Sequence, residues 1–123
     1  MNKVLVTGGA GYLGSIISRK LIERGYSVCC FDRLYFGKEP IHDLLDNEKF
    51  ELVKGNLIDI DRYHDLLKGV DAVIHLAGIA NDPTGDLQPE MTQLVNYDAT
   101  VRLGELAKKS GVKRFVFASS CSV

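Results

Sequence analysis

Thr7-Gly8-Gly9-Ala10-Gly11-Tyr12-Leu13-Gly14 sets the architecture of this chain of 123 residues. The apolar run 4–6 precedes it, and a segment with apolar residues at helical spacing follows it: Leu13, Ile16, Ile17 and Leu21. The order is therefore strand, glycine turn, helix. The glycines fit Gly-x-Gly-x-x-Gly read from Gly9 and Thr-Gly-x-x-Gly-x-x-Gly read from Thr7. A turn of this kind between a strand and a helix predicts a dinucleotide site.

The turn has the properties that a pyrophosphate requires. Gly8 can adopt a positive φ, and Gly11 lets backbone amides approach a ligand where a side chain would collide. The first amides of the helix, at Tyr12 and Leu13, lack partners within the helix and carry the positive end of its dipole. We therefore expect a pyrophosphate to bind at this helix N-terminus.

An acidic residue, Asp32, ends the second predicted strand, which covers residues 27–31. It follows Gly14 by 18 residues. A carboxylate at such a position accepts hydrogen bonds from both ribose hydroxyls and repels a 2′-phosphate, which favours NAD over NADP as the cofactor. The neighbouring Arg33 is a second candidate contact, because a basic residue could tolerate a phosphate.

The rest of the chain alternates strands with helices. Further strands are expected at residues 50–54, 71–75 and 113–118, a helical turn at 41–45, a short helix from Asp59 or Asp61 to Leu67, and a long helix from Pro89 or Glu90 to Ser110. This alternation predicts an α/β fold with a doubly wound parallel (Rossmann) sheet in the order 3-2-1-4-5, truncated after strand 5. The ligand crevice then lies beyond the carboxyl ends of strands 1 and 4.

Composition narrows the class of protein. The chain is 46% hydrophobic and 25% charged with a formal net charge of −1, which indicates a single globular domain without the basic excess of a nucleic-acid-binding protein. No apolar run has the length of a membrane span, and the first residues read as a strand, so we expect a cytoplasmic protein without a membrane partner. Three cysteines show no metal-binding spacing, and Cys29 and Cys30 are expected as buried thiols on opposite faces of a strand.

With these residues in view, the chain resembles the N-terminal part of an extended short-chain dehydrogenase/reductase. The resemblance is to the NAD-dependent epimerase/dehydratase family of nucleotide sugars, and it covers residues 1–123. The motifs that carry it come in the family's order: the glycine turn, Asp32, Gly55-Asn56-Leu57-Ile58-Asp59, His75-Leu76-Ala77-Gly78, Asn96 within Val-Asn-Tyr-Asp-Ala-Thr, and Phe117-Ala-Ser-Ser-Cys-Ser-Val123.

The resemblance implies a role for each matching position around NAD. Gly8, Gly11, Tyr12 and Leu13 would line the pyrophosphate, and Asp32 would hold the adenosine ribose. The remaining cofactor contacts would be Asn56 and Leu57 at the adenine, Leu76, Ala77 and Gly78 beside the ribose and nicotinamide, and Ser119 and Asn96 near the active site.

Ser120 matches the family's catalytic serine, whose hydroxyl would hydrogen-bond the sugar oxygen that is oxidised. Asn81, Asp82 and Thr84 are as well explained by an ordinary loop as by substrate contact. His75 ends an apolar strand without a catalytic or metal-binding partner at useful spacing, so we expect a core histidine with satisfied hydrogen bonds. His42 and His64 are expected at the surface.

The family's Tyr-x-x-x-Lys pair is the main departure, because none of the five tyrosines has a lysine four residues later. We therefore expect a fragment that lacks the C-terminal substrate-binding part and is inactive alone. The intact protein would be a homodimeric nucleotide-sugar epimerase that acts by transient hydride transfer to NAD. Alternatives are a dehydratase, which is disfavoured because Cys121-Ser122 stand where that branch has Asp-Glu, a reductase, or a non-enzymatic NAD(P)-sensing module.

The fifth predicted strand would be an exposed, Val/Phe-rich edge in such a fragment. We expect the 123-residue chain to self-associate through this edge unless further residues cover it. Sedimentation of the purified chain tests this, and a chain that stays monomeric at high concentration would contradict it.

Overall fold

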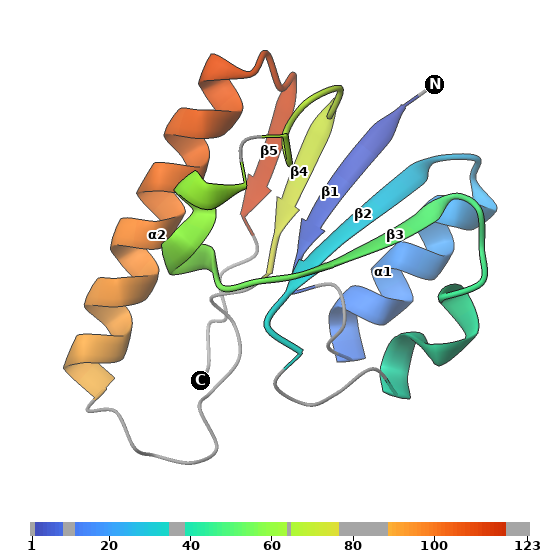
Figure 1. Ribbon diagram of the computed structural model, residues 1–123, viewed down its shortest axis with the longest axis horizontal. Coiled ribbons are helices and arrows are strands. Elements are labelled where there is room, and N and C mark those ends of the chain that lie inside the picture. The colour runs from blue at the N-terminus through green and yellow to red at the C-terminus, as the bar shows by residue number, and fades with distance from the viewer. Residues whose placement is uncertain (1, 9–11, 35–38, 64, 77–88, 118–123) are drawn as a thin grey trace.

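A parallel sheet of five strands forms the centre of the computed structural model, which describes residues 2–8, 12–34, 39–63, 65–76 and 89–117. The strands are β1 (Lys3–Thr7), β2 (Ser27–Asp32), β3 (Phe50–Lys54), β4 (Ala72–His75) and β5 (Arg114–Phe117), in the spatial order β3-β2-β1-β4-β5 (Figure 1). This confirms the predicted order. The chain moves outward from β1 to β3, then returns to the other side of β1, so the strand order reverses between β1 and β4.

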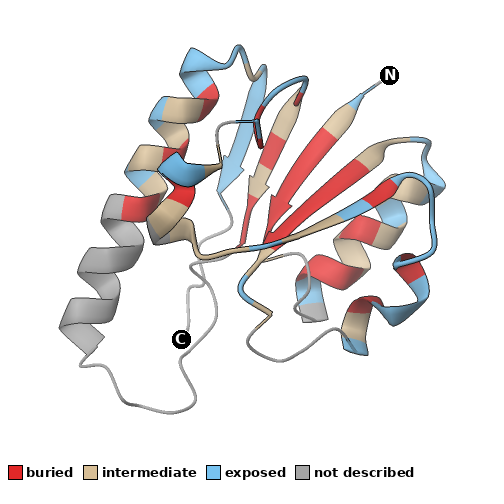
Figure 2. Ribbon diagram, in the orientation of Figure 1, coloured by how far each residue is buried: buried red, intermediate tan, exposed pale blue. Residues whose placement is uncertain are grey.

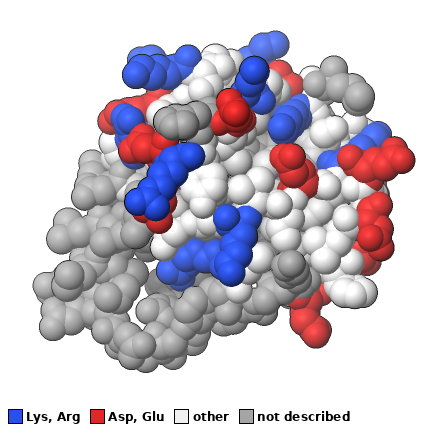
Figure 3. All heavy atoms as spheres, in the orientation of Figure 1, with Lys and Arg blue, Asp and Glu red and all other residues white. Residues whose placement is uncertain are grey.

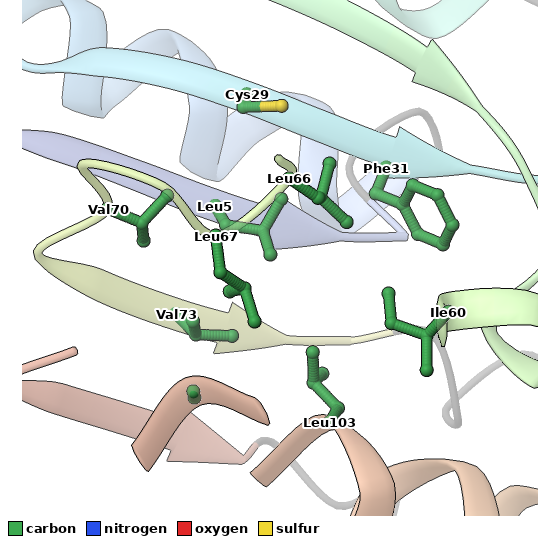
Figure 4. Close-up of a cluster of buried hydrophobic side chains, with 10 residues drawn as sticks. Leu5, Cys29, Phe31, Ile60, Leu66, Leu67, Val70, Val73 and Leu103 are labelled. Carbon is green, nitrogen blue, oxygen red and sulfur yellow. The ribbon is translucent and has the colours of Figure 1, made fainter. Parts of the chain in front are cut away.

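Helices cover both faces of this sheet. The helices α1 (Tyr12–Glu23) and η1 (Glu39–Leu44) lie on one face, and η2 (Leu57–Arg62) and α2 (Pro89–Lys109) lie on the other (Figure 1). Alternate residues of the strands face the two layers, as a strand's period of two requires. Figure 4 shows the core on the α2 side, and Figure 2 shows burial concentrated in the inner strands.

The two adjacent cysteines of β2 follow this alternation. Cys29 belongs to the core cluster on the α2 side and Cys30 to the cluster on the α1 side, and both are buried. Burial raises the pKa of the Cys29 thiol to about 12, which leaves it protonated at neutral pH. The prediction of buried thiols on opposite faces is confirmed.

A short helix is present where one was predicted, but the predicted bounds, from Asp59 or Asp61 to Leu67, are wrong. The structure has a 3₁₀ helix, η2, that begins at Leu57 and ends at Arg62, and turns at residues 65–69. Backbone hydrogen bonds of the i to i+3 type recur, from Tyr63 N–H to the Ile60 carbonyl (3.0 Å) and from Leu66 N–H to the Tyr63 carbonyl (3.0 Å). The physical reason is a three-residue spacing of apolar side chains that pack on one core: Leu57, Ile60, Tyr63 and Leu66.

Strand β5 is exposed along its whole length. The fractional exposure is 38% for Phe115, 52% for Val116 and 50% for Phe117, and the strand is pale blue in Figure 2. The expectation of an exposed apolar edge is confirmed, whereas self-association through it stays a prediction.

Candidate functional site

The glycine turn joins β1 to α1 at the carboxyl edge of the sheet. Gly8 has a φ of 78°, a conformation that favours glycine. Its N–H donates to the Phe31 carbonyl of β2 at 2.8 Å. This hydrogen bond fixes the start of the turn against the neighbouring strand. Helix α1 begins at Tyr12, which places the amides of its first turn and the positive end of its dipole beside this edge.

Leu13 was expected on the apolar face of α1 together with Ile17 and Leu21. The structure corrects this, because Leu13 is 48% exposed whereas Ile17 and Leu21 pack against the core. The reason is its position in the first turn, beyond the edge of the sheet that the rest of the helix covers. An exposed leucine at the start of α1 agrees with the separate expectation that Leu13 lines a ligand.

Asp32 lies at the end of β2, next to the glycine turn. Its Oδ1 accepts a hydrogen bond from the Leu34 backbone N–H at 2.7 Å, and its backbone carbonyl accepts from the Gly55 N–H at 2.9 Å. Leu34 has a φ of 60°, which is unusual for a leucine. The carboxylate therefore caps a tight turn that directs the chain away from the sheet, while Arg33 is exposed.

Asn56 and Leu57, the predicted adenine contacts, follow β3 and are both half-buried. The preceding Gly55 lies against two aromatic rings, those of Phe31 and Tyr63, which meet edge to face with centroids 4.9 Å apart. A Cβ on Gly55 would lie 2.5 Å from Tyr63 Oη and 2.7 Å from Phe31 Cε2. This aromatic pair explains why a glycine begins the motif, and it fixes the path of the backbone that carries Asn56.

We expect Gly55→Ala to lower the free energy of unfolding by about 1–3 kcal/mol, because the methyl group overpacks the Phe31–Tyr63 pair. Gly104→Ala is the matched control: apart from its chain neighbours and the backbone of its own helix, nothing lies within 4 Å of a Cβ there, and alanine in a helix is more stable than glycine by about 0.5–1 kcal/mol. Denaturant unfolding measures both. Equal effects of the two substitutions would contradict the steric explanation.

His75 is fully buried at the end of β4, as expected of a core histidine with satisfied hydrogen bonds. Its Nδ1 lies 2.5 Å from Thr7 Oγ1 and its Nε2 lies 2.8 Å from Thr100 Oγ1. Burial lowers the pKa of the imidazole to about 4, so the ring is neutral at pH 7. The Leu76 N–H donates both to the Thr7 carbonyl (2.9 Å) and to Thr7 Oγ1 (3.1 Å), which brings Leu76 beside the glycine turn.

Sequence reasoning missed Thr7 and Thr100 as partners of His75. They are 68 and 25 residues from it in the chain, and only the adjacency of β1 and β4 offers a signal for the first. His42 is exposed, as predicted.

Several predicted site residues lie outside the part of the chain that the structure describes. Asn96 belongs to α2, but its side chain and that of Tyr12 are not among the described ones. The positions wholly outside it are His64, Gly11, Ala77, Gly78, Asn81, Asp82, Thr84, Ser119 and Ser120.

Three features of the described residues concern charge, membrane spans and metal ligands. Figure 3 shows basic and acidic side chains interspersed on the face that carries β3 and η2. Within the described ranges, no helix combines the length and the apolar character that a membrane span needs. Among the same residues, no three potential metal ligands come together.

The described edge fits a dinucleotide in its donor and acceptor chemistry. The start of α1 offers backbone donors for a pyrophosphate, Asp32 offers a carboxylate one strand away for a ribose, and exposed Leu13 offers an apolar surface. Leu76 is held against Thr7 at the point where the strand order reverses, which is where ligands bind in open α/β sheets.

Comparison with known proteins gives matches over almost the whole chain. The NAD dependent epimerase/dehydratase family matches residues 4–123. A UDP-glucose 4-epimerase of Klebsiella pneumoniae is 32% identical over 98% of this chain and 91% of its own length. A UDP-N-acetyl-alpha-D-glucosaminuronate decarboxylase of Bacillus cytotoxicus is 32% identical over 98% of this chain, which spans 37% of that protein.

A similar solved structure is the UDP-glucose-4-epimerase of Stenotrophomonas maltophila with bound NAD and formylated UDP-arabinopyranose. It superposes on this chain with a TM-score of 0.83 at 27% sequence identity, and the match covers 100% of this chain. The chain spans 38% of that structure, so it corresponds to part of the longer proteins that it resembles.

Proposed function

The chain belongs to the NAD-dependent epimerase/dehydratase family, and from this membership we propose that it is the NAD-binding portion of a nucleotide-sugar epimerase. The observation that supports this most directly is the meeting of Gly8, the start of α1, Asp32 and Leu76 at one edge of the sheet. The epimerases among its relatives support the substrate class.

NAD bound at this edge would accept a hydride from a carbon that carries a sugar hydroxyl and later return it. The chain's own groups hold the cofactor in place for this. Amides at the start of α1 would donate to the pyrophosphate, and Asp32 would accept from the ribose hydroxyls and disfavour NADP. Asn56 and Leu57 would contact the adenine, and Leu76, Ala77 and Gly78 would lie near the nicotinamide end.

Ser120 is the catalytic residue that we propose within this chain, with Ser119 and Asn96 in support. Its hydroxyl hydrogen-bonds the sugar oxygen and so helps to position the proton that leaves it. The base would be a tyrosine of a Tyr-x-x-x-Lys pair that these 123 residues do not contain. A lysine and a positively charged nicotinamide near that tyrosine would lower its pKa.

Two experiments separate this function from the alternatives. The longer protein that contains these residues should interconvert UDP-sugars epimeric at one carbon, measured by chromatography, without net consumption of NAD. A dehydratase would release a dehydrated sugar, a reductase would consume reduced cofactor, and a sensing module would bind NAD without turnover. The 123-residue chain should bind NAD only weakly and epimerise nothing, so epimerisation by this chain would contradict the assignment of the base.

A further inference from the structure

His75, at the end of β4, contacts three other elements: β1, α2 and β5. Its ring contacts the Thr7 hydroxyl at the end of β1 and the Thr100 hydroxyl in α2. Phe117, the last residue of β5, stacks on the ring with centroids 5.3 Å apart and an interplanar angle of 24°. The ring itself is fully buried. Its contact with Thr7 is buried and its contact with Thr100 is partly buried, so both hydrogen bonds are stronger than they would be in water.

These contacts link the parts of the site that we propose to act together. Thr7 directly precedes Gly8, whose backbone starts the glycine turn, and its oxygens receive the Leu76 N–H. Phe117 precedes Ser119 by two residues in sequence. Thr100 is one helical turn after Asn96 on α2. The ring therefore connects the cofactor side of the site with the two elements that lead to its proposed catalytic side.

The surroundings of the ring favour one assignment of donor and acceptor for each of its two hydrogen bonds. Thr7 Oγ1 already accepts from the Leu76 N–H, and its hydroxyl proton is suited to donate to a bare Nδ1. A threonine hydroxyl inside a helix commonly donates to a carbonyl in the preceding turn and keeps its lone pairs for accepting. Thr100 is then suited to accept from Nε2–H. A neutral imidazole can donate from one nitrogen and accept at the other, which is what these two contacts require.

We propose that His75 is a positioning residue of the cofactor site. With its proton on Nε2, the ring accepts a hydrogen bond from Thr7 at Nδ1 and donates one to Thr100 from Nε2. It thereby fixes the positions of the glycine turn and the end of β4 relative to α2. This inference rests on the proposed NAD site, because the effect of the positioning is exerted on NAD. His75 itself touches neither cofactor nor substrate in this role.

The test uses a pair of substitutions on the far side of the ring from the glycine turn. Thr100→Val keeps the shape of the side chain and removes the acceptor, whereas Thr100→Ser keeps the acceptor and removes a methyl group. We expect Thr100→Val to weaken NAD binding about fivefold, the equivalent of one neutral hydrogen bond, and Thr100→Ser to bind like the unsubstituted chain. Isothermal titration calorimetry with NAD measures this, and the thermal unfolding of each variant is recorded beside it.

Nitrogen-15 NMR of the histidine-labelled chain gives a readout that packing alone would not move. We expect the signals of His75, recognised because the ring does not titrate near neutral pH, to show a protonated Nε2 and a bare Nδ1. Thr100→Val should shift this tautomer balance, and Thr100→Ser should restore it.

The outcomes are distinguishable. A protonated Nδ1 in the unsubstituted chain, or unchanged NAD binding by Thr100→Val in a folded chain, overturns the positioning role while leaving the NAD site intact. Equal loss of affinity by the valine and serine variants assigns the effect to packing and overturns it too. No NAD binding by the unsubstituted chain overturns the proposed function itself, and the positioning role with it.

Discussion

Replacing Asp32 with alanine is expected to weaken NAD binding about 100-fold, equivalent to about 2.7 kcal/mol. In the proposed site the Asp32 carboxylate would accept from two ribose hydroxyls, and hydrogen bonds to a charged acceptor contribute about 1.5–3 kcal/mol each. Asp32→Asn should lose less, about tenfold, because an amide oxygen can still accept from Leu34 N–H and from one hydroxyl. Titration calorimetry of the folded variants measures these affinities.

The cofactor preference provides the second readout for Asp32. The unsubstituted chain should bind NAD more tightly than NADP, and both variants should narrow that difference because they remove the charge that repels a 2′-phosphate. Asp46→Asn changes the net charge by the same amount at an exposed position beyond η1 and should alter neither affinity. If Asp32→Ala binds NAD as well as the unsubstituted chain does, Asp32 is not the ribose ligand.

The free energy of unfolding is expected to fall by about 3 kcal/mol as the pH is lowered from 6.5 to 4. Burial lowers the pKa of the His75 imidazole from 6.5 to about 4 in the folded chain. Between these values the unfolded chain binds more protons than the folded chain, so the unfolding free energy rises with pH. The stabilisation is therefore complete above pH 6.5 and is lost as the pH approaches 4, and the difference between the two pKa values sets its size.

Urea unfolding at a series of pH values measures this dependence, with His75→Gln as the test and His42→Gln as the control. His42 is exposed, so its loss should leave the slope in place, whereas His75→Gln should flatten it. The Asp43 carboxyl, whose pKa a hydrogen bond from Arg19 lowers to about 2, titrates below this window. An equally steep slope after His75→Gln would show that another group is responsible.

The sequence predicted the elements whose pattern is local. The strand at residues 50–54 alternates apolar and polar side chains, and the run that ends at His75 is apolar throughout, so both strands were found. The position of Asp32 at the end of β2 and the strand order also followed, because strands that alternate with helices allow few topologies.

What the sequence could not predict depends on contacts between distant segments. The bounds of η2 are one example: the capping candidates Asp59 and Asp61 predicted a start that is too late, whereas the observed start at Leu57 depends on how the apolar side chains of this stretch pack on the core. The contact of Gly55 with Phe31 and Tyr63 exists only once β2, the end of β3 and the residue that follows η2 are packed together. The Thr7–His75–Thr100 cluster likewise exists only once β1, β4 and α2 are assembled.

Titration of the 123-residue chain with NAD and with NADP, by calorimetry at neutral pH and low salt, is the most direct measurement. We expect a single saturable site for NAD, weaker binding of NADP, and loss of that preference in Asp32→Ala. A folded chain that binds no NAD, or that binds both dinucleotides equally with or without the Asp32 carboxylate, would contradict the assignment of this edge as an NAD site.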